Sequence, residues 1–296
     1  MVRKGRNGKR GRSVALDLRS LIQSTYPSLP DNQRKIADVL LQRIREVPFL
    51  SVNDLEELSG ASKATVVRLA QNLGFSGYLE LRERLREGVQ SELSQGEMLP
   101  LLSGRRGEET LTAVARQDVK NINQTIAQID RAVFLRVAGL LLKAEHVYTF
   151  GLGISSLLAR MLSYSLNQVA VRSTPFGHEH ETFFEQIHQV GTSDVAVAFS
   201  FHPYSRETID TARALAARGV SVVAVTDRFT SPVCFVSKAV LPIASQNLLF
   251  TNSISAVSVL INALTTEVAL RSKNRATNNL RETEELLQKA AHYFNE

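Results

Sequence analysis

The sequence predicts an α/β protein in which a small all-helical domain precedes a doubly wound parallel sheet. Its 296 residues correspond to about two domains of ordinary size. Apolar residues follow a helical spacing over residues 14–92. Residues 130–296 instead alternate short apolar, β-rich runs with helical stretches, which is the pattern of a buried parallel sheet with crossover helices.

The composition is that of an ordinary globular protein, with 44% hydrophobic and 22% charged residues. The single cysteine, Cys234, cannot form an intramolecular disulfide, which excludes a disulfide-stapled secreted scaffold and indicates a reducing cytosol. Asp17 and Arg19 interrupt what would have to be the apolar core of a signal peptide. We therefore expect a cytoplasmic protein.

One uncharged stretch, residues 239–266, is long enough to span a membrane. It contains Pro242, Asn247 and Asn252, which are unfavourable in hydrocarbon. We expect a strand, a loop and a buried helix there, and no membrane association.

The net charge of +6 is concentrated at the N-terminus, because residues 1–90 hold 16 Lys and Arg against 10 Asp and Glu. Residues 1–13 form a basic arm that we expect to be disordered when free and attracted to polyanions. A solubilising tail or a cloning remnant is the alternative. The bases of the arm are Arg3, Lys4, Arg6, Lys9, Arg10 and Arg12.

Short helices fill the predicted N-terminal domain, residues 14–92. The first spans residues 16–24, and Asp31 is predicted to cap the second. Ser51 and Asp54 form a possible capping box for the third helix, which Gly60 ends after barely two turns.

The next helix begins at Ser62, a good N-cap, and carries one apolar stripe of Val66, Leu69, Ala70 and Leu73. Two short helices joined by a tight glycine turn are typical of a helix-turn-helix. Arg68, on the other face, can pair bidentately with guanine, and Lys63 can meet phosphate. A small helical bundle that binds protein or nothing is the alternative. The candidate DNA-binding residues are Ser62, Lys63, Ala64, Thr65 and Arg68.

The run from Ser51 to Tyr78 resembles the helix-turn-helix of the RpiR/MurR family of bacterial transcription regulators. The resemblance is carried by Ser62-x-Ala-Thr-Val-Val-Arg-Leu69, followed by Leu73-Gly-Phe-Ser-Gly-Tyr78. It implies that the helix starting at Ser62 is the recognition helix and that the partner is double-stranded operator DNA.

Residues 93–109 lack a helical or strand period and are predicted to be a linker. Helical patterns return over residues 109–128 and from Asp130, as a cap, to Leu142. These two helices either join the domains or serve dimerisation. We assign residues 110–296 to the second domain.

In the second domain we predict strands at 146–150, 169–172, 194–199 and 220–225, with a helix at 205–218 between the last two. Ligands of such sheets bind beyond the carboxyl ends of the strands.

Two predicted loops lie at such ends. Gly151 and Gly153 let backbone amides approach an anion at a helix N-terminus, and the hydroxyls of Ser155 and Ser156 can add hydrogen bonds. The loop 200–208 offers further hydroxyls and suits a small phosphorylated ligand.

Two alternatives bear on these loops. As an alternative to ligand binding, Ser200 and Ser205 of the second loop would serve only as a helix cap and as turn residues. Ser156 stands where the third glycine of a dinucleotide fingerprint belongs, so we expect no nicotinamide cofactor.

The turn Gly151-Leu-Gly-Ile-Ser155, the loop 200–208 and the run 219–227 followed by Ser231-Pro232 are similar to segments of the SIS, or sugar-isomerase, domain that RpiR-type regulators carry. The resemblance implies that Ser155, Ser200 and Ser205 hold a sugar phosphate, with Ser156 adjacent. The sequence departs from the usual Ser-x-Ser-Gly-x-Thr in the second loop, where His202 replaces a serine and Pro203 the glycine. Proline donates no N–H, so we expect the effector to differ from an ordinary sugar phosphate.

The segment 178–185 places Glu181 and Glu185 on the face of His178 if it is helical. No third histidine completes a metal site, so we expect neither a metal nor a catalytic role there. Cys234, between Val233 and Phe235, is predicted to be a buried small side chain rather than a nucleophile.

These patterns predict a DNA-binding transcription regulator, not an enzyme, whose second domain senses a phosphorylated or acidic metabolite. A homodimer or homotetramer with recognition helices about 34 Å apart fits a palindromic operator. A sugar-phosphate isomerase-like enzyme with an accessory DNA-binding domain is the alternative, with Glu179, Glu181 or His202 as candidate bases. A scaffold that binds only protein is the third reading.

Overall fold

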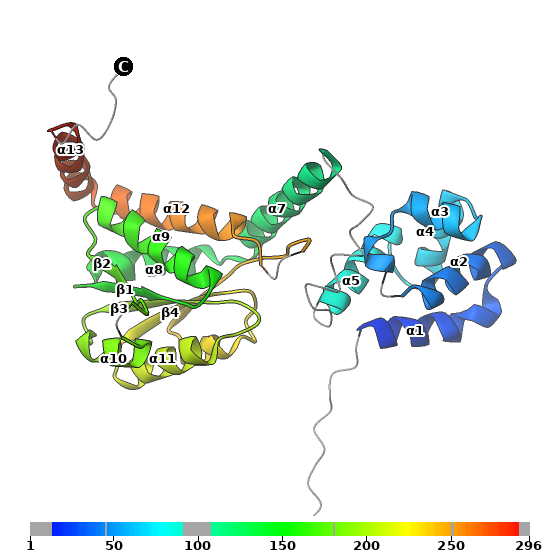
Figure 1. Cartoon of the computed structure of the whole chain (residues 1–296), viewed down its shortest axis with the longest axis horizontal. Helices are drawn as coiled ribbons and strands as arrows, with labels where there is room; N and C mark the ends of the chain where they lie inside the picture. The colour runs from blue at the N-terminus through cyan, green and yellow to red at the C-terminus, as the bar shows by residue number, and fades with distance from the viewer. Residues whose placement is uncertain (1–13, 45, 91–107, 180, 250–251, 290–296) are drawn as a thin grey trace, which may run out of the picture. The chain divides into compact units, whose positions relative to one another are not determined.

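The computed structural model describes residues 14–44, 46–90, 108–179, 181–249 and 252–289. It divides into two compact units, residues 1–107 and 108–296, which are described separately (Figure 1). The predicted basic arm and almost all of the predicted linker lie outside the described residues.

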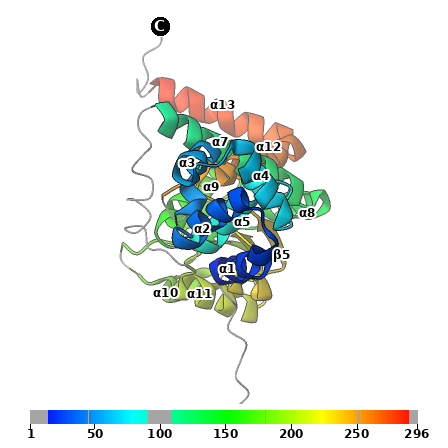
Figure 2. The same ribbon diagram turned by 90° about the vertical axis from the view of Figure 1, so that its right-hand side faces the viewer.

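Unit 1 is all-helical, and each predicted helix is present. Its helices are α1 (Val14–Thr25), α2 (Asp31–Gln42), α3 (Val52–Ser59), α4 (Lys63–Asn72) and α5 (Tyr78–Gln90). All five contribute side chains to one core, in which Ile22, Leu40, Leu55, Leu69 and Leu85 are almost completely buried. Figure 2 shows the ribbons of these helices from a second direction.

The helix ends follow local sequence chemistry. Ser51 and Asp54 form the predicted capping box, since the Ser51 N–H donates to the Asp54 carboxylate (2.5 Å) and the Asp54 N–H to the Ser51 hydroxyl (3.1 Å). Gly60 ends α3 with a φ of 65°. The prediction that Asp31 caps α2 is wrong, because Pro30 is the N-cap and Asp31 already lies in the first turn. There its negative charge interacts favourably with the helix dipole instead.

Unit 2 contains a five-stranded, all-parallel sheet in the order β2-β1-β3-β4-β5. The strands are β1 (Val147–Phe150), β2 (Ser173–Pro175), β3 (Val195–Ser200), β4 (Ser221–Thr226) and β5 (Ala239–Pro242). Helices α8 (Arg131–Lys143), α9 (Ile154–Gln168) and α12 (Ser255–Arg271) cover one face; α10 (Phe183–Gln186) and α11 (Arg206–Ala217) cover the other (Figure 1). The predicted doubly wound fold is confirmed.

Both faces of the sheet are buried, as the continuous apolar strands require. Along β3, Val195, Val197 and Phe199 point to the core beneath α8, α9 and α12. Ala196 and Ala198 point to the other core, with Phe150, Phe183 and Leu215.

The predicted strand at 169–172 is wrong. These residues form the turn after α9, in which Ala170 adopts a φ of 62° and the Val171 N–H donates to the Leu166 carbonyl. Val169 and Val171 are buried because the turn packs on the core, which explains their strand-like pattern. The second strand follows at Ser173–Pro175.

The uncharged stretch 239–266 forms β5, a loop and the largely buried start of α12, as predicted. Among the helices of the described ranges, none is both long and apolar enough to cross a membrane. Two further helices, α7 (Glu108–Gln128) and α13 (Lys273–Lys289), pack against α12.

Candidate functional site

The first candidate site is the outward face of α4. The Ser62 hydroxyl caps the helix by accepting from the Thr65 N–H (3.4 Å). Val66, Leu69 and Ala70 are buried against the core, as predicted. The opposite face points outward, since it is formed by exposed Ser62, Lys63, Ala64 and Arg68 with half-buried Thr65.

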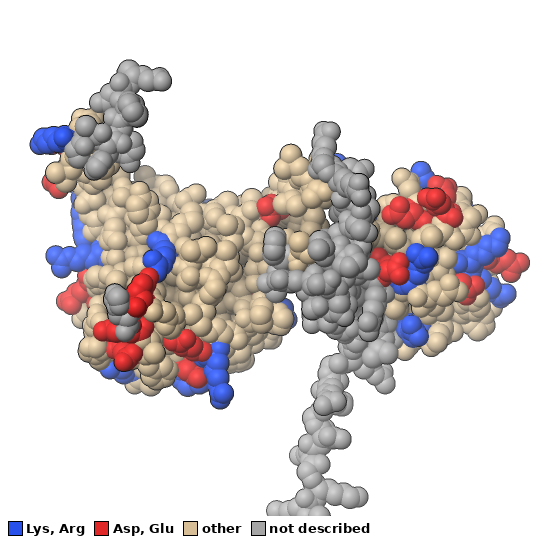
Figure 3. Space-filling view, in the orientation of Figure 1, with Lys and Arg blue, Asp and Glu red and all other residues tan. Residues whose placement is uncertain are grey.

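The two cationic side chains of this face, Lys63 and Arg68, differ in their contacts. The Lys63 ammonium lies 3.7 Å from the Glu56 carboxylate of α3. Arg68 has no hydrogen-bond or ion-pair partner among the described residues. Figure 3 shows Lys and Arg interspersed with Asp and Glu on the visible face of unit 1.

Polar contacts attach α4 and the start of α5 to the rest of unit 1. The Asn72 amide donates to the Gln33 side-chain oxygen of α2 (2.8 Å). The Tyr78 hydroxyl, at the start of α5, donates to the carbonyls of Val47 (3.2 Å) and Leu50 (3.0 Å). Burial raises the pKa of Tyr78 well above its ordinary value, so this hydroxyl stays protonated and remains a donor.

The second candidate site lies at the carboxyl edge of the sheet in unit 2. Strand order 2-1-3-4-5 places the topological switch point between β1 and β3, and ligands of doubly wound sheets bind there. The loops that follow these two strands are 151–156 and 200–208. The structure thus brings the two predicted loops together at the switch point.

The first loop needs glycine at both of its glycine positions, for different reasons. A Cβ on Gly151 would lie 2.6 Å from the Ser155 Cβ and 2.7 Å from the Phe199 carbonyl oxygen, so the loop lies directly against the end of β3. Gly153 adopts φ 61° and ψ −129°, which other residues avoid. Ser155 is 5% exposed. The Ser156 hydroxyl donates to the Gly153 carbonyl (2.7 Å) and is already engaged.

The second loop contains an unsatisfied hydroxyl. Ser200 is 3% exposed, and its Oγ has no hydrogen-bond partner among the described atoms. Thr208 Oγ1 is likewise buried without a hydrogen-bond partner among the described atoms. Ser205 caps α11 by accepting from the Thr208 N–H (3.3 Å), which is the alternative role considered for it above. His202 is exposed.

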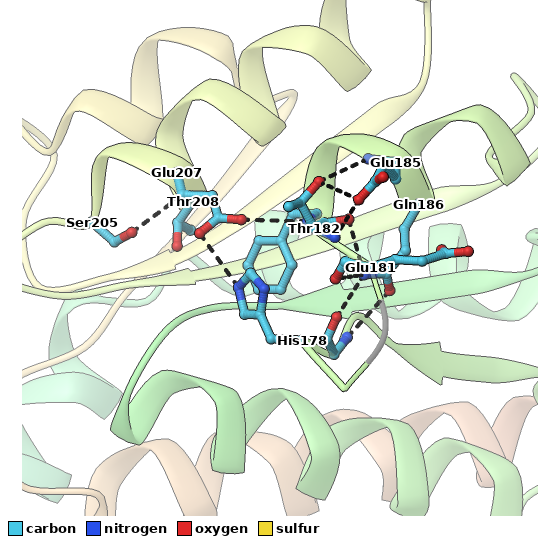
Figure 4. A network of polar contacts seen from close by, with 10 residues as sticks. His178, Glu181, Thr182, Glu185, Gln186, Ser205, Glu207 and Thr208 are labelled. Carbon is cyan, nitrogen blue, oxygen red and sulfur yellow. Dashed lines mark hydrogen bonds and ion pairs between the residues drawn. The ribbon is translucent and has the colours of Figure 1, made fainter.

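The segment before α10 lies beside the second loop (Figure 4). His178 Nε2 is 3.4 Å from the Glu207 carboxylate, and the other oxygen of Glu207 accepts from the Phe183 N–H (3.3 Å). Only residues 183–186 are helical, so His178, Glu181 and Glu185 do not share one helical face. His180 lies outside the described residues. Within the described part of the chain, no three His, Cys, Asp or Glu side chains gather as a metal site.

Sequence reasoning missed a polar pair at the end of β4. The Tyr204 hydroxyl of the second loop donates to the Asp227 carboxylate (2.9 Å). Burial, together with this carboxylate, raises the pKa of Tyr204 to about 12, so its hydroxyl remains a donor. The position of Asp227 directly after a buried strand was the available signal.

Cys234 is only partly buried, contrary to the predicted burial. Its thiol lies 3.5 Å from the Arg228 carbonyl, and burial raises its pKa. A raised thiol pKa means less thiolate and therefore a weaker nucleophile.

Comparison with known proteins agrees with this architecture. Residues 16–92 match the helix-turn-helix domain of the rpiR family, and residues 140–267 match the SIS domain. An uncharacterized HTH-type transcriptional regulator of Haemophilus influenzae is 27% identical over 215 residues, which are 72% of this chain and 74% of that protein.

Two solved structures are similar to this chain. The sugar isomerase domain of the RpiR transcription factor from Sphaerobacter thermophilus is 28% identical with a TM-score of 0.57, over 59% of this chain and 97% of that one. The Vibrio vulnificus NanR protein, complexed with ManNAc-6P, shares the fold at 23% identity with a TM-score of 0.57, over 92% of this chain and 98% of that one.

The two units together define a transcription regulator that joins a helix-turn-helix domain to an α/β SIS domain. The helix-turn-helix match over residues 16–92 and the SIS match over residues 140–267 are the two domains that the resemblance to RpiR-type regulators implies.

Proposed function

We propose that α4 reads double-stranded operator DNA through Ser62, Lys63, Ala64, Thr65 and Arg68. The outward orientation of this face supports the assignment, as does the absence of a described partner for Arg68. Arg68 has the length and the planar fork to pair with guanine in the major groove. The small side chain of Ala64 permits close approach, and Lys63 contacts phosphate.

Unit 2 binds a small phosphorylated or acidic metabolite at the switch point, held by Gly151, Gly153, Ser155, Ser156, Ser200, His202 and Ser205. The observation that carries this proposal is the buried, unpartnered hydroxyl of Ser200, next to the loop that Gly151 holds against β3. A phosphate would accept hydrogen bonds from this hydroxyl and from amides at the N-terminus of α9. The ManNAc-6P complex of NanR is consistent with a ligand of this class.

The effector modulates operator binding, and the protein is not an enzyme. Isomerisation requires a positioned base near the substrate carbonyl. Of the candidate bases, Glu179 is engaged in an ion pair with Arg160, and His202 is exposed. Conversion of a bound aldose phosphate to its ketose would overturn this part of the proposal.

The functional form is a homodimer or a higher homo-oligomer. Figure 3 shows a broad face of unit 2, over α9 and α12, with few charged side chains. Leu157, Tyr164 and Val259 of these helices are exposed, and such patches mark interaction sites. A twofold dimer would read a palindromic site with half-sites about 34 Å apart.

The effector site is tested by thermal shift with glucose 6-phosphate, glucosamine 6-phosphate and N-acetylmannosamine 6-phosphate, on the full chain. The Ser200→Ala variant should lose about 10-fold to 100-fold in affinity for a sugar phosphate that stabilises the wild type, since hydrogen bonds to charged groups contribute about 1.5–3 kcal/mol. Ser258→Ala, on α12, removes a serine hydroxyl bonded to Ile254 and serves as the control. Equal affinities of the two variants would refute the site.

A further inference from the structure

Helix α7 docks on unit 2 through an unusual polar stripe. Gln117, Asn121 and Thr125 recur every four residues and are 7%, 0% and 4% exposed. Leu111 and Ile126, by contrast, are 71% and 65% exposed. An ordinary amphipathic helix buries its apolar residues and exposes its polar ones. Hydrogen bonds therefore add to the packing of Ile122 and Ile129 against the core in holding α7 in place.

The stripe binds the segment that joins β5 to α12. The Asn121 amide donates to the Gln246 carbonyl (2.7 Å), and the Thr125 hydroxyl oxygen accepts from the Ala244 N–H (2.9 Å). Gln117 donates to the side-chain oxygen of Gln246 (3.3 Å). Three buried side chains of α7 thus bond to Ala244 and Gln246 of one segment.

Asp118 adds a second attachment to the same segment. One carboxylate oxygen accepts from the Ser253 hydroxyl (2.5 Å) and the other from the Ser255 hydroxyl (2.7 Å). Ser255 is the first residue of α12. The carboxylate therefore ties α7 to the point where the segment becomes helix.

The other end of this hydrogen-bonded path lies in the second loop of the proposed effector site. The Asn252 amide donates to the main-chain carbonyl of His202 (2.8 Å), and its oxygen accepts from the Ser245 hydroxyl (2.9 Å). The Ser253 N–H donates to the Ser245 carbonyl (2.8 Å). Asn252 consequently connects His202 to the same segment that holds α7.

We propose that Asn252 and Asp118 are positioning residues that couple the state of the second loop to the docking of α7. Hydrogen bonds are directional and weaken steeply when an angle or a distance changes, whereas apolar contacts tolerate sliding. A buried polar group that loses its partner is destabilising, so the stripe favours discrete arrangements of α7. In the order of the sequence, α7 is the first helix of unit 2 and therefore the one nearest to unit 1 along the chain. The proposal rests on the proposed function, in which the second loop contacts the effector.

Hydrogen–deuterium exchange on the full chain tests the coupling without any ligand. Asn252→Asp keeps the size of the side chain but cannot donate to the His202 carbonyl. Exchange of α7 amides in residues 115–126 should rise about tenfold in this variant. Asn279→Ala is the matched control, because Asn279 also donates to two main-chain carbonyls, those of Asn167 and Gln168, outside this path. If α7 exchange in Asn252→Asp equals that in the wild type and the control, the coupling is refuted.

The same measurement with inorganic phosphate, glucose 6-phosphate and glucosamine 6-phosphate separates this proposal from the proposed function. In the wild type, a bound probe should change exchange both in residues 200–208 and in α7. Asn252→Asp and Asp118→Asn should keep the change in 200–208 and lose the change in α7. A change in 200–208 without one in α7 of the wild type refutes the coupling. No change in 200–208 with any probe refutes the phosphate site, while the ligand-free comparison still decides the coupling.

Discussion

Glu56 of α3 forms an ion pair with Lys63, the first residue of α4, with 3.7 Å between Oε2 and Nζ. Because both side chains are about half exposed, water screens the pair and its partner can be exchanged. Under the proposed function, in which Lys63 contacts phosphate, DNA and Glu56 would compete for the same ammonium group. The carboxylate acts as an internal competitor at the proposed DNA interface.

Glu56→Gln should raise the affinity for any duplex by up to about fivefold, because exposed ion pairs contribute about 0.2–1 kcal/mol. The salt dependence of binding should steepen by up to about one phosphate contact. Fluorescence anisotropy with a random-sequence duplex, over a series of salt concentrations, measures both. The double variant Glu56→Gln/Lys63→Gln should show no gain in affinity over Lys63→Gln. A gain in affinity there would mean that Glu56 acts through a group other than Lys63.

Arg68→Ala should weaken binding to the selected operator by about 1–3 kcal/mol and relax the preference at one base pair. Selection from a randomised duplex pool supplies the operator, and competition binding measures the preference. Arg131→Ala removes one charge from the start of α8 in unit 2 and is the charge-matched control. If Arg68→Ala weakens all sequences equally, Arg68 contacts phosphate rather than a base.

Gly151→Ala and Gly153→Ala should both destabilise unit 2, for different reasons. The first introduces a methyl group 2.6–2.7 Å from atoms of Ser155 and Phe199 and should lower the free energy of unfolding by about 1–3 kcal/mol. The second has open space around the new methyl group, but its φ of 61° is strained for alanine, by about 1 kcal/mol or more. Urea denaturation of the full chain measures both losses. Wild-type stability in either variant would contradict the corresponding reason.

His146 gives unit 2 a pH dependence of known sign. Burial lowers its pKa below the ordinary 6.5, so the folded protein holds it neutral where the unfolded chain binds a proton. Stability should therefore fall as pH drops through 6.5, and should be fully present above it. In His146→Gln this dependence is absent, so the melting temperature of the wild type should fall relative to the variant in acid. Parallel melting curves at all pH values would refute the assignment.

Local patterns predicted correctly which residues of α4 are buried and which are exposed, because the information is contained within the helix. Val66, Leu69 and Ala70 follow the helical period and had to face the core, which left Arg68 outside. Helix caps at Ser51, Ser62 and Asp130 were equally readable, since each cap involves only the next three residues.

Long-range relationships were not predictable from the sequence. The strand order that brings Gly151 next to Phe199 depends on crossovers, which leave no local pattern. Asn252 lies 50 residues from His202 and was visible only as a polar residue in an uncharged stretch. The wrong prediction of a strand at 169–172 had a different cause. Ala170 adopts a left-handed backbone conformation, which is usually adopted by glycine, so the sequence did not indicate a turn there.

In the proposed effector site, main-chain amides bind the phosphate and side chains contact the sugar. Gly151 and Gly153 present backbone amides, which recur identically whatever sugar carries the phosphate. In this proposal, discrimination among sugars falls to side chains outside the sheet, at His202 and in residues 176–179 and 181–186. Substitutions there would retune the response to a new metabolite while leaving the two cores untouched. The same fold can in this way respond to different metabolites without a change in its two cores.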